Sequence, residues 1–423
     1  MRWIGGLAIG LVLGAAPVMA QTPEQVAEAA LRAAPVWDGH NDVPIQLRGR
    51  YHNVIAGFDF ADTGRTGDPA AAGTFRARPM HTDLARLRKG HVGAQFWSVF
   101  VSADLPEAEA VQATLEQIDV TRRLVARYPA DLQWALTAAD VERAMARGRI
   151  ASLIGMEGGQ SIGSSLGVLR QMYALGVRYM TLTHAKNTPW ADSATDRPAH
   201  GGLTDFGKDV VREMNRLGML VDLAHVSEAT MLDALDVARA PVIFSHSGAR
   251  AVNGHARNLP DNVLERLRAN GGIVMAVALP SYVSEPVRQW QADRKGEEAR
   301  LQSLWQGQPD AVAAGLAAWD EAHPEPKATV AELADHIDHL RQVAGIDHIG
   351  IGGDYDGMAT GPVGMEDVAG YPALFVELAR RGYSQADLEK IASRNMLRVL
   401  RAAESYAAAH RADPPIESPV RGD

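Results

Sequence analysis

The chain has 423 residues, 46% hydrophobic and 22% charged, which is typical of a globular protein and excludes a disordered or fibrous one. Its formal net charge of -9 disfavours a surface for nucleic acid or anionic membranes. Because the chain contains no cysteine, disulfides, thiolate metal ligands and a cysteine nucleophile are excluded, so any metal site must use His, Asp and Glu. The length allows two or three average domains or one large α/β barrel with additions.

The first twenty residues have the pattern of an export signal. Arg2 supplies the positive charge, an apolar run covers 4–13, and Ala20 is the small residue after which cleavage is expected. The apolar run is short for a membrane span, so a retained anchor is the weaker alternative. We therefore expect a periplasmic or secreted protein. The polar tail at 411–423 carries no apolar segment, so we expect no membrane anchor after signal cleavage.

An apolar run ends at Trp37, and His40 and Asp42 follow it two residues apart. In an extended segment, residues i and i+2 point to the same face, so these side chains could hold one cation together. A His-x-Asp pair is frequent by chance and, taken alone, is better explained as a capped turn after a strand. Residues 57–78 follow without periodicity and predict a long loop, a class that is often functional.

Short apolar runs alternate with helical patterns along the rest of the chain. After the strand before His40, predicted strands cover 92–100, 150–156, 179–182, 220–223, 242–244, 272–278 and 348–351. Predicted helices cover 82–89, 107–128, 138–147, 166–175, 204–217, 228–237, 260–268, 329–343 and 386–403. Apolar strands that alternate with helices indicate a parallel sheet covered on the outside. Eight such units predict a closed (β/α)8 barrel of the TIM type. A doubly wound open sheet is the alternative, although no Gly-rich nucleotide turn follows the first strand.

Residues 284–327 interrupt this alternation. The segment is charged, bears Gln and Trp, is helix-prone and closes with Pro324 and Pro326. We interpret it as an insertion after the seventh strand. Active sites of such barrels lie at the carboxyl ends of the strands, so the insertion is a candidate lid. Residues 21–410 are then expected to form one metallohydrolase domain.

Metal-capable and acid-base side chains gather just after the predicted strands. They are His40, Asp42, Glu157, His184, His225, His246 and Asp354. Because the carboxyl ends of barrel strands converge on one face, we expect these seven side chains to meet there. Other histidines serve as controls. His336 and His339 lie on a predicted outer helix, and His348 begins a strand, where a role in stability is expected.

A cysteine-free set of three His, one Asp and one Glu suits a divalent cation, with Zn²⁺ as the first choice. Five ligands are too many for one open site and fit two ions that share a carboxylate, for which Glu157 is the natural bridge. Two ions about 3.5 Å apart can hold a bridging hydroxide near neutral pH. Asp354 is expected to take and pass on its proton, and His184 to stabilise a developing oxyanion. Singly, each histidine has the alternative of a structural residue or a helix cap.

Several motifs carry a resemblance to a known family. They include Asp38-Gly39-His40-Asn41-Asp42, Gly155-Met156-Glu157-Gly158-Gly159, Leu182-Thr183-His184, Asp222-Leu223-Ala224-His225, Phe244-Ser245-His246-Ser247, Arg257-Asn258-Leu259-Pro260-Asp261 and Gly352-Gly353-Asp354-Tyr355-Asp356-Gly357. In this order, they resemble the membrane (renal-type) dipeptidase family, peptidase family M19, over roughly residues 35–404. The chain looks like an exported bacterial member.

The resemblance implies a (β/α)8 barrel with two zinc ions that share Glu157. His40 and Asp42 would complete one site, and His225 and His246 the other. The implied reaction is hydrolysis of dipeptides, including L-D dipeptides, by metal-bound hydroxide, with Glu157, His184 and Asp354 as the catalytic residues. His184 and Asp354 would also touch the substrate, Arg257 would pair with its free carboxylate, and Tyr282 completes the expected substrate-binding set. The missing cysteines exclude the disulfide-linked dimer of animal members and leave a non-covalent homodimer open.

Two other functions stay open from the sequence. Another barrel metal hydrolase, such as a lactonase or phosphotriesterase, commonly bridges its metals with a modified lysine, whereas the third predicted strand here ends in Glu157. The other is a non-catalytic periplasmic binding protein that kept a metal site, which would bind dipeptides tightly without cleaving them. The presence of all five predicted ligands argues against it.

Overall fold

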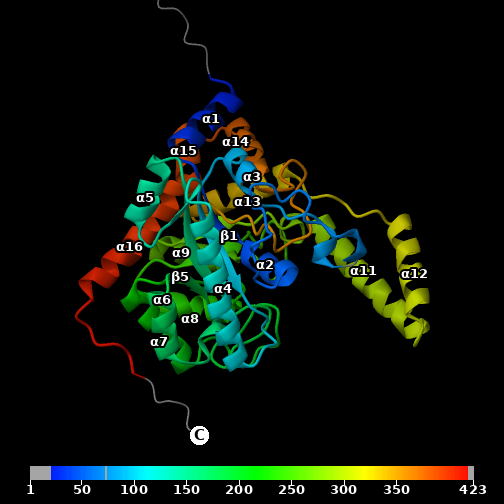
Figure 1. The fold of residues 1–423 in the computed structure, drawn as a ribbon, viewed down its shortest axis with the longest axis horizontal. Coiled ribbons are helices and arrows are strands. Elements are labelled where there is room, and N and C mark those ends of the chain that lie inside the picture. The colour runs from blue at the N-terminus through cyan, green and yellow to red at the C-terminus, as the bar shows by residue number, and fades with distance from the viewer. Residues whose placement is uncertain (1–20, 72–73, 418–423) are drawn as a thin grey trace, which may run out of the picture.

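The computed structural model describes residues 21–71 and 74–417 (Figure 1). The predicted export signal at 1–20 and residues 418–423 of the predicted tail lie outside the described residues. Among the helices of the described ranges, none is long and apolar enough to cross a bilayer.

Eight parallel strands of the described residues close into a barrel. They are β1 (Val36–Asn41), β2 (Val92–Phe100), β4 (Ile150–Glu157), β5 (Val177–Thr181), β6 (Leu220–Asp222), β7 (Ile243–Ser247), β8 (Ile273–Ala276) and β9 (Ile349–Ile351). Neighbours follow the order β2-β1-β9-β8-β7-β6-β5-β4, and the pairing of β2 with β4 closes the ring. The predicted (β/α)8 barrel is therefore confirmed, and the open-sheet alternative is wrong. The strands read as continuous apolar runs because they are buried on both faces, as β4 is at all its positions.

A further strand, β3 (Leu132–Trp134), lies outside the predicted set. It pairs with the beginning of β4, at 150–152, whereas β5 pairs with the later part of β4, at 154–157. The strand extends the sheet beside the ring without entering it. Three residues are too few to produce a recognisable apolar or alternating run, which explains why the sequence pattern did not reveal it.

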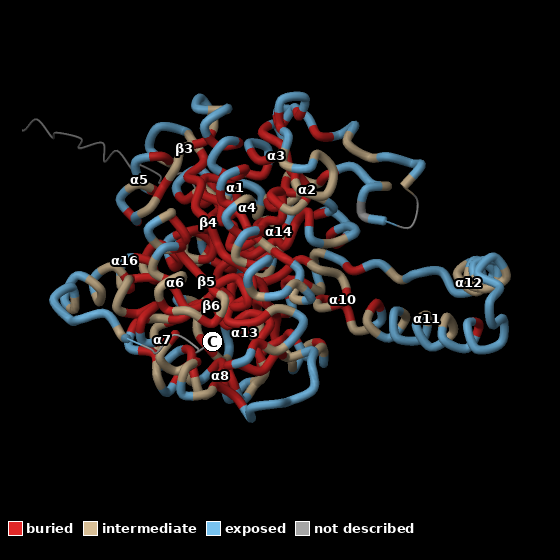
Figure 2. Tube along the Cα trace, turned by 60° about the horizontal axis from the view of Figure 1, so that its bottom comes forward, coloured by how far each residue is buried: buried red, intermediate tan, exposed pale blue. Residues whose placement is uncertain are grey.

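Helices cover the outside of the barrel, and Figure 2 shows the buried strands at its centre. They are α1 (Pro23–Ala33), α2 (Val43–Tyr51), α3 (Leu84–Lys89), α4 (Glu107–Arg127), α5 (Ala138–Ala146), α6 (Leu166–Ala174), α7 (Asp205–Leu217), α8 (Glu228–Val237), α9 (Asp261–Asn270), α13 (Val330–Val343), α14 (Tyr371–Arg380), α15 (Gln385–Glu389) and α16 (Asn395–Ala409). The sequence analysis missed α1, α2 and α14. The predicted last helix is interrupted by a π-helical stretch at Lys390–Arg394 and continues to Ala409.

The insertion after the seventh barrel segment projects as an arm (Figures 1 and 2). It follows β8 and the short α10 (Pro280–Val283), and it consists of α11 (Glu285–Leu304) and α12 (Pro309–Ala322). The two helices are held together by the Trp290 and Trp319 rings, 5.6 Å between centroids, and by Arg294 with Asp320 at 2.7 Å. Every residue of α12 is described, and none is buried. In both views the arm points away from the barrel, so its role as a lid stays a prediction.

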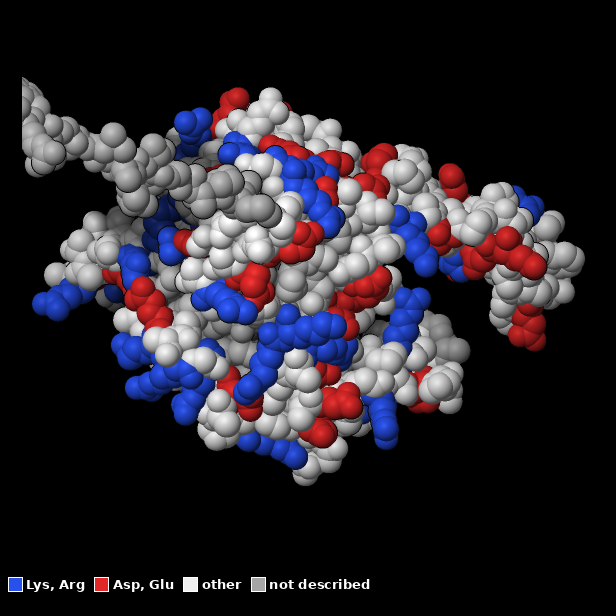
Figure 3. All heavy atoms as spheres, turned by 90° about the horizontal axis from the view of Figure 1, so that it is seen from above, with Lys and Arg blue, Asp and Glu red and all other residues white. Residues whose placement is uncertain are grey.

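The face drawn in Figure 3 carries both charge signs. Lys and Arg side chains lie among Asp and Glu side chains over the barrel, and acidic side chains gather on the projecting arm. The visible face is therefore mixed in sign.

Candidate metal centre and active site

The loops at the carboxyl ends of the barrel strands enclose a cavity of about 720 Å³. Eight of the nine residues that the sequence analysis singled out line this cavity: Asp42, Glu157, His184, His225, His246, Arg257, Tyr282 and Asp354. The ninth, His40, is fully buried, and its imidazole contacts the same carboxylates. Residues from the ends of six different strands thus meet in one place, as expected for the active face of such a barrel.

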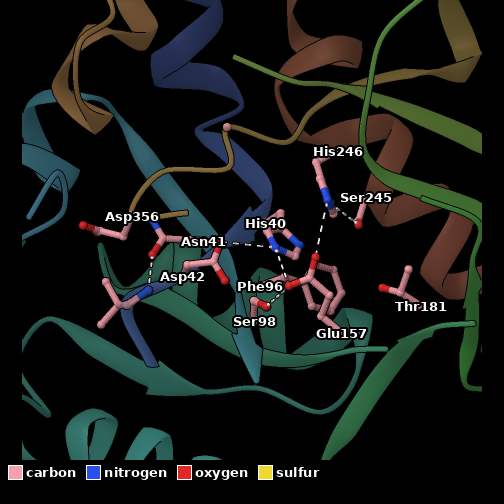
Figure 4. Close-up of polar contacts among 12 residues, drawn as sticks. His40, Asn41, Asp42, Phe96, Ser98, Glu157, Thr181, Ser245, His246 and Asp356 are labelled. Carbon is pink, nitrogen blue, oxygen red and sulfur yellow. Dashed lines mark hydrogen bonds and ion pairs between the residues drawn. The ribbon is translucent and has the colours of Figure 1, made fainter. Parts of the chain in front are cut away.

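Glu157, the last residue of β4, lies at the centre of this group (Figure 4). Its Oε2 is 3.4 Å from His40 Nε2 and accepts a hydrogen bond from Ser98 Oγ at 3.1 Å. Its Oε1 is 3.0 Å from His225 Nε2 and 3.6 Å from His246 Nε2. The two carboxylate oxygens therefore face different histidines, which suits a carboxylate shared by two cations.

The Nε2 atom of His40 faces the carboxylates of Asp42 and Glu157. Tyr179 donates its hydroxyl proton to the carbonyl oxygen of Gly39 at 3.3 Å, and the same hydroxyl oxygen lies 2.9 Å from His40 Nδ1. With the hydroxyl proton on Gly39, Nδ1 donates in that contact, and Nε2 is then the acceptor nitrogen of the neutral ring. Nε2 is buried without a hydrogen-bond partner and lies 3.5 Å from Asp42 Oδ2. A buried acceptor nitrogen beside two carboxylates fits a metal ligand.

The groups around His40 favour a positive charge at its imidazole. Burial alone would lower the pKa of His40, but Tyr179, Glu157 and Asp42 outweigh burial and hold that pKa well above its ordinary value. In the absence of a cation, this buried cluster therefore favours a proton on the imidazole. A divalent ion would supply the same charge between the carboxylates and release that proton.

His225 and His246 form the other half of the centre. Their Nε2 atoms are 3.0 Å apart, and both lie close to Glu157 Oε1. Ser245 donates its hydroxyl proton to Asp222 at 2.7 Å, so its oxygen accepts from His246 Nδ1 at 2.9 Å. With the proton of His246 on Nδ1, the lone pair on its Nε2 points toward Glu157. Burial lowers the pKa of both imidazoles well below the ordinary value, so both are neutral, as metal ligation requires.

Three strand-end residues have a backbone conformation that side chains rarely adopt. The φ angles of His225, Asp354 and Asp356 are 68°, 62° and 68°. Such left-handed conformations cost about 1–3 kcal/mol each and concentrate at functional sites, where the surrounding structure holds them. At His225 and Asp354 the strained turn brings the side chain into the cavity.

Asp354 and His184 are suited to proton transfer and to hydrogen bonding. Burial, together with Asp42 and Glu157, raises the pKa of Asp354 well above its ordinary value despite the opposing effect of His40. A carboxyl group with a raised pKa can carry a proton closer to neutral pH. Burial lowers the pKa of His184, whose side chain is 23% exposed and whose Nε2 is 3.9 Å from Glu157 Oε1. A neutral imidazole at that place can donate to a developing oxyanion.

Arg257 is a buried cation whose donors are not all used. It is 1% exposed, and its Nη2 donates to the carbonyl oxygen of His246 at 3.3 Å. Its Nε and Nη1 atoms are buried without a hydrogen-bond partner. The Tyr282 ring centroid lies 5.6 Å from Cζ of Arg257. A buried guanidinium with unused donors at the wall of a cavity is well suited to bind an anionic group.

The described residues contain three groups of side chains that could hold a metal ion, and all three lie in this centre. They are His40 with Glu157 and His246, Glu157 with His184 and His225, and His40 with Asp42 and Asp354; within each group the ligand atoms lie within 4.8 Å of one another. The groups share members, and none of them coincides with either of the two expected ligand sets. The expected division of the ligands between two ions therefore stays a prediction.

The control histidines lie outside these groups. His336 uses both ring nitrogens, since Nδ1 accepts from the backbone N–H of Ala249 at 2.9 Å and Nε2 contacts the carbonyl oxygen of Val283 at 3.0 Å. His348 donates from Nδ1 to the carbonyl oxygen of Gly272 at 2.8 Å. Both are structural residues in this fold.

Sequence reasoning missed the residues that orient the predicted ligands. Tyr179 and Ser245 fix the histidine tautomers, and Asp222 anchors Ser245. Asp38 is also buried. It accepts from the Tyr371 hydroxyl at 2.6 Å and from the Gly353 N–H at 2.8 Å, which ties the end of β1 to the end of β9. Asp38, Asp222 and Ser245 belong to the motifs quoted above, but their partners lie far away in the chain.

A family model for membrane dipeptidases, peptidase family M19, matches residues 24–414. This chain belongs to that family. It is 41% identical over 397 residues to Dipeptidase 3 of Macaca fascicularis, covering 93% of this chain and 70% of that protein. Among solved structures, it is similar to the probable dipeptidase PvdM from Pseudomonas aeruginosa, with a TM-score of 0.76 and 26% identity over 91% of this chain and 99% of that one. A dipeptidase described as a metallo peptidase of family M19 gives a TM-score of 0.68 and 25% identity over 88% of this chain and 98% of that one.

These matches confirm the resemblance drawn from the motifs and the enzyme class that it implied, a metallo-dipeptidase of family M19. They also agree with the barrel fold, which the family shares with the solved relatives.

Proposed function

We propose that this protein hydrolyses the peptide bond of dipeptides, including those with a D-residue at the carboxyl end, with two zinc ions held on either side of Glu157. The observation that carries this proposal is the position of Glu157, whose two oxygens face separate imidazole nitrogens. The buried Arg257, with two unused donors in the same cavity, supports a substrate that ends in a free carboxylate.

The side chains present fit two divalent cations. His40 and Asp42 with Oε2 of Glu157 would hold one ion, and His225 and His246 with Oε1 would hold the other. A set of neutral imidazoles and carboxylates without thiolates is well suited to Zn²⁺. When bound, the ions would polarise the scissile carbonyl and lower the pKa of the attacking water.

Arg257 would select and orient the substrate. A substrate carboxylate can accept hydrogen bonds from the guanidinium through one of its unused donors, Nε or Nη1, and the neighbouring Nη2, which fixes the carboxyl end of the dipeptide. Because the arginine is buried within the same cavity, a chain that continued past the second residue would leave its charge unpaired. The guanidinium binds the carboxylate and makes no demand on the side chain of that residue, which supports the inclusion of D-residues.

The remaining two residues would act on protons and charge. His184 would donate a hydrogen bond to the substrate oxygen as negative charge develops on it. Asp354 would take a proton from the attacking water and deliver it to the leaving amine. The export-signal pattern at 1–20 supports an activity outside the cytoplasm, in the periplasm or the surroundings of the cell.

A panel of L-L and L-D dipeptides tests this proposal, with purified protein assayed after chelation and after zinc addition. We expect turnover that chelator abolishes and zinc restores, and two zinc ions per chain by elemental analysis. A lactone and a phosphotriester are included to test the other barrel hydrolases. Turnover of those esters without dipeptide hydrolysis, or dipeptide binding without cleavage, would refute the proposal.

A further inference from the structure

The cavity extends beyond the Glu157 centre to a second wall, away from Arg257. This outer wall consists of Arg50, Thr74, Arg78, Met358 and Ala359. It comes from α2, from the loop that the sequence analysis predicted at 57–78 and from the segment after β9. Arg257 follows β7 instead, which stands three places from β1 in the ring. The two walls therefore offer arginines at separate parts of one cavity.

Arg78 is held at this wall by defined contacts. Its Nη1 donates to the carbonyl oxygen of Ala359 at 2.9 Å, which joins the loop to the segment after β9. Arg50 fastens the loop from the other side, because its Nη2 donates to the carbonyl oxygen of Arg78 at 2.9 Å and its Nη1 to that of Thr66 at 2.8 Å. The position of Arg78 is thus set by α2 and by the β9 loop together.

Arg78 lies within reach of a substrate at the Glu157 centre. Ala359 comes two residues after Gly357, and two extended residues span at most about 7 Å. Gly357 itself is in close contact with the centre, since a Cβ atom there would lie 2.3 Å from Asp42 Oδ2 and 2.7 Å from Asp354 Oδ1. A long side chain on a substrate residue near Asp42 can therefore extend to the guanidinium of Arg78.

The charge of Arg78 is not neutralised by the protein. Its guanidinium donates to a backbone carbonyl, and within the described part of the chain it forms no ion pair. Asp354 and Asp356 also line the cavity, and their carboxyl oxygens can accept hydrogen bonds from a substrate ammonium group. The Arg78 guanidinium is therefore available to a negatively charged group elsewhere on the substrate.

These positions fix an order along the cavity. If Arg257 holds the terminal carboxylate and the scissile bond lies at Glu157, the first residue of the dipeptide extends toward the outer wall. We propose that Arg78 pairs with a carboxylate on the side chain of that first residue, so that the enzyme prefers dipeptides that begin with an acidic amino acid. This inference rests on the proposed dipeptidase function and adds a substrate class to it.

A matched pair of substrates, L-Glu-L-Ala and L-Gln-L-Ala, tests the inference, because the two differ in charge and hardly in shape. We expect kcat/KM to favour the Glu substrate about two- to fivefold, as for a partly exposed ion pair, mainly through KM. The preference should shrink as ionic strength rises. Arg78→Gln should bring the ratio to about one, and Arg78→Lys should retain part of it.

Arg65→Gln is the matched control, since Arg65 is an exposed arginine of the same loop that does not line the cavity. It should keep the wild-type ratio, and thermal melting should show that all variants are folded. Equal kcat/KM for the two substrates in the wild type, or a Glu preference that survives Arg78→Gln, would overturn this inference alone. Failure to cleave either dipeptide would overturn this inference, and failure to cleave any dipeptide of the L-L and L-D panel would overturn the proposed function with it.

Discussion

Replacing Arg257 with methionine should separate binding from stability. The wild-type guanidinium is buried and makes one hydrogen bond to a neutral carbonyl, while two of its donors have no partner. Hydrogen bonds to a charged group contribute about 1.5–3 kcal/mol each, so loss of the two bonds that a bidentate substrate carboxylate accepts should cost at least about 3 kcal/mol. Since 1.4 kcal/mol corresponds to about tenfold, kcat/KM should fall at least about 100-fold.

The same substitution should not weaken the fold. Arg257→Met removes one hydrogen bond worth about 1 kcal/mol, but it also removes the desolvation penalty of a buried charge, which amounts to several kcal/mol. The midpoint of thermal unfolding without substrate should therefore stay equal or rise.

Steady-state kinetics on a dipeptide and on its carboxyl-amidated form would check the cause. Wild type should prefer the free acid by about the factor lost in Arg257→Met, and the variant should treat the two forms alike. An unchanged preference for the free acid in the variant, or a loss of activity explained by a lower melting midpoint, would refute the assignment of Arg257 as the carboxylate-binding residue.

Three further predictions follow from the same geometry. The raised pKa of Asp354 means that the folded, metal-free protein binds more protons than the unfolded chain, so its stability falls as pH rises from the ordinary pKa of Asp toward the raised one. Metal-free Asp354→Asn should therefore melt higher than metal-free wild type at neutral pH, and an equal or lower midpoint would contradict this. Asp42→Ala should lose mainly the ion shared with His40, so zinc content by elemental analysis should fall from two toward one per chain; loss of both ions would mean that the sites are not separable. Ser245→Ala removes the acceptor that orients His246, and zinc affinity in a competition titration should drop about 10- to 100-fold; an unchanged affinity would exclude that role.

The barrel and the candidate ligands could be predicted from the sequence because both depend on local patterns. A buried parallel strand is a continuous apolar run, and the polar residue that ends it, such as Glu157 or His246, must lie on the active face once the ring closes. β3 escaped prediction because it has only three residues. For α2 the cause is similar, since a helix of nine residues begins directly after Asp42 and offers little periodicity.

The orientation of the ligands could not be predicted, because it depends on contacts between distant strands. Tyr179 reaches His40 from β5, and Ser98 reaches Glu157 from β2. The burial of a side chain cannot be predicted from a short motif either. Nothing in the local sequence around Arg257 shows that its guanidinium is enclosed with two unused donors, and that enclosure is the basis for its proposed role.

The central claim, that Glu157 joins two metal ions into one hydrolytic centre, is tested most directly by zinc content and dipeptide turnover measured side by side in wild type and Glu157→Gln. We predict two zinc ions per chain and chelator-sensitive turnover for wild type. For a folded Glu157→Gln, we predict loss of at least one ion and of nearly all turnover. Full dipeptide hydrolysis by Glu157→Gln, or an active wild-type protein that carries no metal, would contradict the claim.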